Sequence, residues 1–418
     1  MRPDSRLYQI VVLLVVSSLI CVNARSQDVL HVPSDPQSFA QRLDWAKTTA
    51  KSNSALLDGF WIGYSIERYM HENSRMGNSG RNDKYLPTLQ EILSGVGRAD
   101  PDVMQERKLL AAVQKELQSV SEEEKKKRTV LKEVGILLSY PSPDAGTADF
   151  DKVTMSTMDC LVDLKGHPLL WLGVVKDAES IPFLDKLFED SQRDKCKRGL
   201  MAAVSMHETK SLVIPCLQRY ATHEESVELR SQAVFWLAQQ DHPDAFEILK
   251  NVVRKDASSK VRKDTVFWIG QKAKTDDLIK VIETVALEDA EREVRKQAVF
   301  ALSQAPDERG VDALIKIARS KGDQAVQKDA IFWLGQKATK KAMESLEGIV
   351  FDMEQTELQE QAVFAISQRP KDQSIPALSK ICKEHPNPKV RKKAIFWLGQ
   401  TGDPRAVDTL AEILKKSQ

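Results

Sequence analysis

The sequence predicts an all-α fold, an α-solenoid of about eight two-helix repeats preceded by a helical N-terminal region. The first observation is a heptapeptide at residues 233–239 (AVFWLAQ), which returns in closely similar form starting at residues 265, 298, 330, 362 and 394. The second is that successive copies start 32 or 33 residues apart. The third is the helical spacing of apolar residues on both sides of each polar turn. A fixed period of this length is typical of proteins that stack one helical unit many times.

The repeats are predicted to cover residues 165–418, with two weaker copies at residues 168–174 and 201–207 ahead of the six clear ones. Residues 141–164 are predicted to be a linker, since two prolines and a glycine lie at its start. Residues 25–140 are predicted to be a helical N-terminal region. Its expected elements are a flexible terminus at 25–35 and helices over 38–70, 85–95 and 102–139.

Residues 1–24 have the features of a signal peptide for export. Arg2 and Arg6 form a positive start, an apolar run covers residues 10–22, and short residues precede the expected cleavage after residue 24. The run is shorter than the 18 to 20 or so apolar residues that span a bilayer. Cleavage is therefore the expected outcome, with a retained anchor or a lipid attached at Cys21 as alternatives. The mature chain is predicted to be periplasmic or extracellular.

The overall charge is nearly balanced. Lysine and arginine number 61 against 60 acidic residues, which gives a net charge of +1. This balance gives no electrostatic reason to expect nucleic acid as a partner. Beyond the signal segment no stretch is apolar enough to insert into a membrane.

Four cysteines remain after the signal segment, at positions 160, 196, 216 and 382. This number is too small for a disulfide framework in a chain of this length. A bridge between Cys196 and Cys216 is possible across one turn, whereas buried free thiols are the favoured interpretation.

The repeat itself resembles a known family. Residues 390–407 (VRKKAIFWLGQTGDPRAV) are similar to the short HEAT repeat of the subclass named after phycobilin lyases. The resemblance, taken with the signal segment, suggests an exported bacterial HEAT-repeat protein. It implies a fold and leaves the function open, because such repeats serve lyases, hydroxylases and scaffolds alike.

A helical wheel of the repeated heptapeptide predicts which side chains face the core. At 100° per residue, Thr265, Trp268 and Ile269 fall on one stripe, which is expected to pack on the second helix of the repeat. Phe267 falls about 200° from Thr265, almost opposite, with Gln271 beside it. The tryptophans are therefore predicted to be core residues, and the phenylalanines to line the concave surface.

These two rows form the candidate binding site for a protein or peptide partner. The phenylalanine row is Phe235, Phe267, Phe300, Phe332, Phe364 and Phe396. The glutamine row is Gln239, Gln271, Gln304, Gln336, Gln368 and Gln400. A contiguous apolar strip is rarely left bare, and an amide both donates to and accepts from a peptide backbone. The alternative is structural: each ring leans on the next repeat and buries itself there.

No enzyme site is predicted. The resemblance suggests a check of His–Glu dipeptides, since deoxyhypusine hydroxylase binds iron through such pairs, and here they begin at His71, His207 and His223. Their spacing does not match equivalent places in successive repeats, so no metal, cofactor or catalytic residue is expected. The favoured function is a non-enzymatic interaction scaffold. A lyase- or hydroxylase-type enzyme and a structural accessory held through its N-terminal third are the alternatives.

Overall fold

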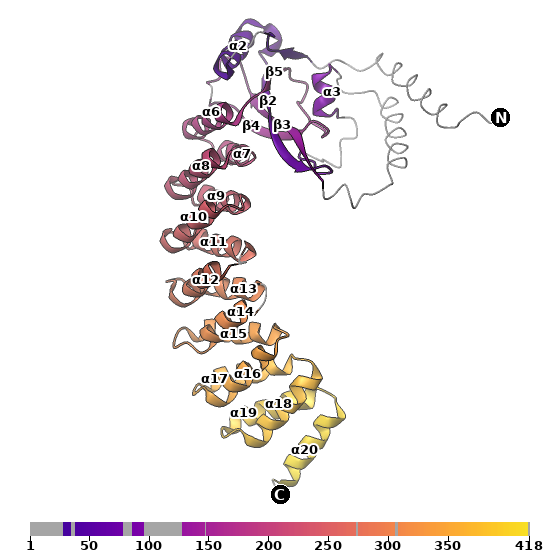
Figure 1. Ribbon diagram of the computed structural model, residues 1–418, viewed down its shortest axis with the longest axis vertical. Coiled ribbons are helices and arrows are strands. Elements are labelled where there is room, and N and C mark those ends of the chain that lie inside the picture. Colours follow the sequence, from indigo (N-terminus) through magenta and orange to yellow (C-terminus); the bar gives the residue numbers. More distant parts are fainter. Residues whose placement is uncertain are drawn as a thin grey trace, which may run out of the picture. The chain divides into compact units, whose positions relative to one another are not determined.

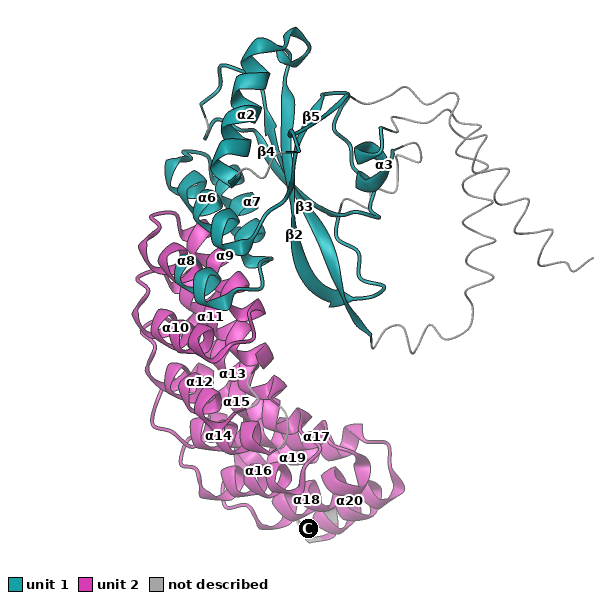
Figure 2. Ribbon diagram, turned by 45° about the horizontal axis from the view of Figure 1, so that its top comes forward, with its two compact units in different colours: residues 1–216 teal, residues 217–418 magenta. Residues whose placement is uncertain are grey.

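The computed structural model describes residues 28–34, 38–77, 86–95, 128–146, 148–272, 275–305 and 308–416. The chain forms two compact units, residues 1–216 and 217–418, which are coloured separately in Figure 2. The predicted signal segment and most of the predicted helix at 102–139 lie outside the described residues. No helix among the described residues is both long and apolar enough to cross a bilayer.

The first unit contains a five-stranded mixed sheet. Its strands are β1 (Val29–His31), β2 (Phe60–His71), β3 (Thr129–Tyr140), β4 (Lys152–Thr157) and β5 (Leu169–Val174), in the order β1-β5-β2-β3-β4. Strand β5 is parallel to β1 and β2, whereas the β2–β3 and β3–β4 pairs are antiparallel. The sheet corrects several expectations for this part of the chain.

Two segments predicted to be helical are strands. Helix α2 (Phe39–Ser52) occupies the first part of the helix expected at 38–70, and α3 (Leu89–Leu93) confirms the helix expected at 85–95. Residues 60–71 and 129–140 instead pair along their whole length as β2 and β3. Their buried halves lie inside the sheet, and a strand covered on both faces has a continuous apolar run that periodicity does not distinguish from a buried helix.

The predicted linker and the first predicted repeat are also part of the sheet. Residues 141–164 include β4, and the apparent repeat copy at 168–174 contributes β5. The first four residues of β5 are buried, and its backbone lies between β1 and β2. This segment is therefore a strand of the sheet and not a helix of the solenoid. Residues 25–35, predicted to be flexible, include β1.

Helices cover both faces of the sheet. On one face, α3 packs through Leu89 over Gly135, where an added Cβ would lie 2.4 Å from the leucine. On the other face, α2 packs through Phe39, whose ring lies 5.1 Å from that of Tyr64. Helix α7 (Asp194–Ser205) packs against β4, with Gly199 close to Val153.

The solenoid begins after β5. Helix α6 (Asp177–Asp190) follows β5 directly and has no preceding helix with which to form a repeat. Seven pairs of helices follow, from α7 to α20. Helix α8 (Lys210–His223) contains the boundary between the units. The first helix of each pair contains the repeated heptapeptide or most of it and is called the motif helix. The motif helices of the second unit are α9 (Val227–Gln239), α11 (Ser259–Lys272), α13 (Arg292–Gln304), α15 (Gln324–Gln336), α17 (Thr356–Ser367) and α19 (Pro388–Gln400). Its second helices are α10 (Pro243–Lys255), α12 (Asp276–Glu288), α14 (Arg309–Ala318), α16 (Lys340–Asp352), α18 (Lys371–Glu384) and α20 (Pro404–Lys416). The predicted α-solenoid is confirmed, with seven complete pairs in place of about eight.

Motif helices and second helices form two layers in the second unit (Figure 1). Each motif helix packs against the motif helices before and after it, and these contacts are more extensive than those between successive second helices. Closer packing in one layer is expected where that layer lines the inner side of a curved array.

Polar caps set where the repeated helices begin. The side chain of Ser226 accepts a hydrogen bond from the backbone of α9, and Asp323 and Asn387 do the same for α15 and α19. Each cap satisfies one of the free N–H groups of the first turn. The polar turns that separate the apolar segments in the sequence are therefore what divides the array into helices.

Arginine–aspartate pairs join successive turns. Arg262 donates from Nε and Nη2 to the two carboxylate oxygens of Asp289 at 2.8 and 2.9 Å, and from Nη1 to the backbone oxygens of Asp256 and Ala257. The two charged side chains are only 11% and 6% exposed. Arg230 repeats the two-oxygen pairing with Asp256, whereas Arg295 donates from Nη2 to one oxygen of Asp323. Both aspartates lie in the turn before the next motif helix.

Candidate functional site

The candidate site lies on the solvent-facing side of the motif helices, which is called the motif-helix face below. Five of the six phenylalanines are half-buried, and Phe396 is 52% exposed. All six glutamines of the row, at positions 239, 271, 304, 336, 368 and 400, are exposed. The face is therefore neither bare nor closed, since rings and amides both remain accessible along its length.

The tryptophans occupy a different place from the one predicted. Thr265 and Ile269 are buried as expected, but Val266 and Gly270 are buried as well, which shifts the centre of the buried arc. Trp268 consequently lies at the edge of that arc and is half-buried. The wheel treated each repeat as a helix pair and omitted the neighbouring motif helices, which bury the Val266 side.

The rings contact one another across repeats. Phe235 lies with its centroid 4.7 Å from Trp236 of its own helix and 4.9 Å from Trp268 of the next, both edge to face. Phe300 with Trp333, at 5.4 Å, repeats the contact between helices, as does Phe364 with Trp397 at 5.2 Å. The two edge-to-face pairs of Phe235 stabilise beyond their buried area, by about 1 kcal/mol each, whereas the other two pairs are tilted. Phe235, Phe300 and Phe364 therefore have the structural role considered for the phenylalanines, and their rings remain partly accessible.

Alanines interrupt the line of rings at two places. Ala301 and Ala365 stand where other motif helices have tryptophan. The preceding helices place Gly270 and Gly335 against them, and a Cβ added to Gly270 would lie 2.7 Å from that of Ala301. Large and small residues thus alternate between neighbouring helices, which lets the layer interdigitate.

The glutamine amides differ in their partners. Gln304 and Gln368 donate to the hydroxyls of Ser303 and Ser367 beside them. The side chains of Gln271 and Gln336 make no hydrogen bond with the described residues. Each amide has two donors and one acceptor oxygen, so this row has hydrogen-bonding capacity left for a ligand.

Two lysines on this face are neutralised by carboxylates of neighbouring motif helices. Lys260 pairs with Glu228 at 3.4 Å, and Lys296 with Asp329 at 3.6 Å, each across two successive motif helices. Burial raises the pKa of Asp329, although Lys296 acts against that shift. The middle of the face therefore offers aromatic edges and uncharged amides, together with Lys263 and Lys328, which have no ion pair among the described residues.

The His–Glu dipeptides do not come together as a site. His71 ends β2, His207 follows α7, and His223 ends α8. His207 is fully buried: its Nε2 contacts the hydroxyl of Ser180 at 2.8 Å, and its Nδ1 contacts the backbone oxygen of Ala203 at 2.9 Å. Burial lowers the pKa of this imidazole. Within the described part of the chain, no three or more His, Cys, Asp or Glu side chains form a group able to hold a metal ion.

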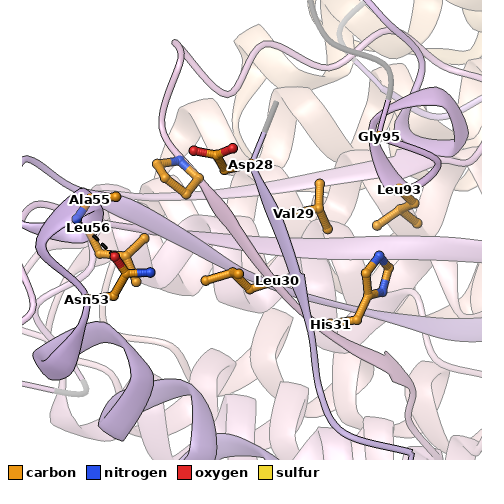
Figure 3. Close-up of a pocket in the computed structure, with 10 residues that line it drawn as sticks. Asp28, Val29, Leu30, His31, Asn53, Ala55, Leu56, Leu93 and Gly95 are labelled. Atoms are coloured by element: carbon orange, nitrogen blue, oxygen red, sulfur yellow. Dashed lines mark hydrogen bonds between the residues drawn. The ribbon is translucent and has the colours of Figure 1, made fainter. Parts of the chain in front are cut away.

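Sequence reasoning missed a pocket in the first unit. It has a volume of about 410 Å³ and lies beside β1, with Leu56 following α2 and Leu93 at the end of α3 (Figure 3). Its polar side chains are separated, with His31 near Leu93 and Asn53 near Ala55. No sequence signal marked it, because the strand that forms one wall was expected to be flexible.

None of the four described cysteines forms a disulfide. Cys196, Cys216 and Cys382 are buried and Cys160 is half-buried. Burial raises the pKa of Cys382 to about 12, so this thiol stays protonated and unreactive at neutral pH. The favoured interpretation, buried thiols outside any disulfide, is confirmed for three of the four.

Comparison with known families identifies the repeated unit. A family model for HEAT repeats matches residues 214–303, 247–335 and 343–418. The solenoid contains HEAT repeats. The matched residues start within α8 and include the motif helices of the second unit except for Gln336 at the end of α15, so they carry all six phenylalanines and five of the six glutamines.

Solved structures resemble part of this chain at low identity. Human deoxyhypusine hydroxylase is 19% identical, with 52% of this chain and 83% of that chain covered and a TM-score of 0.25. The CpcE–CpcF complex of phycocyanin lyase from Nostoc sp. PCC7120 is 20% identical, covers 37% and 99%, and has a TM-score of 0.27. Yeast importin-beta is 14% identical, covers 56% and 36%, and has a TM-score of 0.34. No curated protein matches the sequence significantly.

Proposed function

We propose that this protein is a non-enzymatic scaffold that binds a peptide segment or partner domain along the motif-helix face of its HEAT repeats. The observation that carries the proposal is a pair of parallel rows, in which phenylalanines lie beside exposed glutamines. The pair repeats in six successive motif helices. The rings would supply apolar contact area, and the amides would pair with the ligand backbone.

The chemistry of the face favours a peptide over other ligands. An extended peptide presents N–H and C=O groups alternately, and an amide such as that of Gln271 or Gln336 is able to meet either group. A row of uncharged amides suits a peptide backbone better than the continuous negative charge of a nucleic acid, which binding proteins meet with lysine and arginine.

The glutamine row allows a test that leaves the fold intact. Peptides selected on the immobilised full chain are expected to lose about tenfold or more in affinity for the variant Gln271→Ala/Gln304→Ala/Gln336→Ala. Each lost hydrogen bond is worth about 0.5–1.5 kcal/mol. The measurement is the Kd by fluorescence anisotropy. The free energy of unfolding should stay within about 0.5 kcal/mol per site, because all three side chains are exposed.

The matched control changes three exposed polar residues of second helices and turns. Lys280→Ala/Lys321→Ala/Glu344→Ala should leave peptide affinity unchanged. Selected peptides that bind the glutamine variant as tightly as the unaltered chain would contradict the proposal.

We also propose that the scaffold acts outside the cytoplasm after export. The support is the segment at 1–24, whose charged start, apolar run and short residues fit a cleaved signal. Mass spectrometry of the protein from its native cell should find a mature N-terminus at Arg25. A chain that begins at Met1, or one that carries lipid on Cys21, would reject cleavage at this position.

A further inference from the structure

The C-terminal end of the motif-helix face contains a hollow with an unusual charge. It has a volume of about 390 Å³ and is lined by Glu360 of α17 and by Lys389, Lys392, Lys393 and Phe396 of α19. The four α19 residues follow the spacing i, i+3, i+4 and i+7, so they form one stripe on the helix. Phe396 is the most exposed ring of the phenylalanine row.

The lysines of this hollow differ from two lysines earlier on the face. Lys260 and Lys296 each have a carboxylate partner on a neighbouring motif helix. Lys389, Lys392 and Lys393 make no ion pair with any residue that the structure describes. Three like charges on adjacent turns of one helix repel one another, so an anionic ligand would relieve a cost already present in the free protein.

Acidic residues on the neighbouring helix, α17, indicate which kind of anionic ligand fits the hollow. Glu357 and Glu360 of α17 also have no ion-pair partner among the described residues, and Glu360 lines the hollow on the side of α17. A continuous phosphate backbone would meet their negative charge next to the lysines. A peptide is able to place its acidic residues over α19 and uncharged or basic residues over α17. The exposed Phe396 ring adds an apolar contact of the kind that peptide side chains use.

We propose that the hollow binds an acidic segment of a partner protein, with its carboxylates over Lys389, Lys392 and Lys393 and an apolar side chain on Phe396. This inference rests on the proposed function and specifies the chemistry of the ligand at one end of the face. It also gives the ligand a direction, since its acidic part lies over α19 and its remaining part continues over α17.

The test uses a defined probe. It is a fluorescent peptide of five glutamates followed by leucine and four uncharged polar residues, with a second peptide in which glutamine replaces every glutamate. The full chain should bind the acidic probe about tenfold more tightly than the neutral one. The variant Lys389→Glu/Lys392→Glu/Lys393→Glu should lose at least about tenfold in affinity for the acidic probe, which corresponds to about 1.4 kcal/mol.

Two controls separate this site from general charge. Lys280→Glu/Lys321→Glu/Lys340→Glu makes the same change in net charge on second helices and turns, and it should leave the affinity within about twofold. Phe396→Ala should weaken both probes, because the apolar contact is common to them. A ten-nucleotide oligothymidine should bind more weakly than the acidic peptide.

Three results would overturn the inference: no preference for the acidic probe, an equal loss in the control variant, or tighter binding of the oligonucleotide. Its failure is distinguishable from that of the proposed function. If the selected peptides still depend on Gln271, Gln304 and Gln336 while the acidic probe does not bind, the scaffold stands and the acidic specificity is wrong. If the acidic probe binds through the lysines and no peptide depends on the glutamines, the hollow stands and the extended site is wrong.

Discussion

The substitution Arg262→Ala is expected to lower the free energy of unfolding by about 3 kcal/mol or more, because it leaves a buried carboxylate without its partner. Asp289 is 6% exposed and receives two hydrogen bonds from the guanidinium. The same arginine holds two backbone oxygens of the preceding turn. Urea unfolding followed by circular dichroism gives the free energy, and hydrogen exchange should locate the loss at these two turns.

The array supplies its own control for this prediction. Later in the chain, Gln327 stands in the place of the arginine, Met353 stands in the place of the aspartate, and the glutamine bonds backbone oxygens of its own turn. The double variant Arg262→Gln/Asp289→Met should therefore recover at least half of the lost stability. A cost below about 1 kcal/mol for Arg262→Ala would show that the pair is effectively solvated.

The same pair predicts a dependence on pH. Burial alone would raise the pKa of Asp289, but the hydrogen bond from Arg262 and the surrounding positive charges outweigh it and lower that pKa below its usual value. A lowered pKa stabilises the fold above the carboxyl's unfolded pKa of about 4, and this stability is lost as the pH falls below it. The double variant should show a weaker loss of stability on acidification over that range.

The substitution Gly270→Ala has the second largest expected effect, a loss of about 1–3 kcal/mol from overpacking between α11 and α13. The added Cβ would lie 2.7 Å from the Cβ of Ala301 and 3.3 Å from its Cα, and neither atom can move without shifting a helix. Thermal unfolding should show a lower Tm. In α19, Gly399 occupies the equivalent place, and a Cβ there meets nothing within 4 Å.

Gly399→Ala is therefore the matched control. It should leave stability unchanged or raise it by up to about 1 kcal/mol, because alanine loses less backbone entropy in a helix than glycine does. Equal losses at the two sites would show that the glycines serve a local backbone need and not the close approach of neighbouring helices. Gly270→Ala with Ala301→Gly should restore part of the lost stability.

The sequence predicts the solenoid well because its information is repeated. A single helix pair would give an ambiguous pattern, but six copies in register specify the period, the motif helix and the turn together. The N-terminal region has no such repetition. Residues 60–66 and 134–140 read as apolar runs whose strand character depends on partners more than 60 residues away in the sequence.

The candidate site was only partly predictable for a similar reason. The wheel placed Phe267 and Gln271 on the accessible side, and the structure finds Gln271 exposed and Phe267 half-buried. It placed Trp268 in the core because a wheel describes one helix, and the contacts that bury Val266 and Gly270 come from the neighbouring repeats. The hollow at Lys389 and Phe396 was not predicted, since its depth depends on how α17 and α19 pack.

The alternation of large and small residues makes two repeats, not one, the unit of packing in this part of the array. From α13 onward, alanine and tryptophan take turns in the slot at positions 301, 333, 365 and 397, while serine and glycine take turns two residues later. The glycine of one helix meets the alanine of the next, so the contact that repeats is made by two neighbours of different kinds. Removing one repeat would bring together two motif helices that carry the same residues in these two slots. Removing two repeats would keep every contact between unlike helices. The chemical unit of this part of the array is therefore a tandem of about 64 residues, and the protein is able to gain or lose length without repacking only in steps of that size.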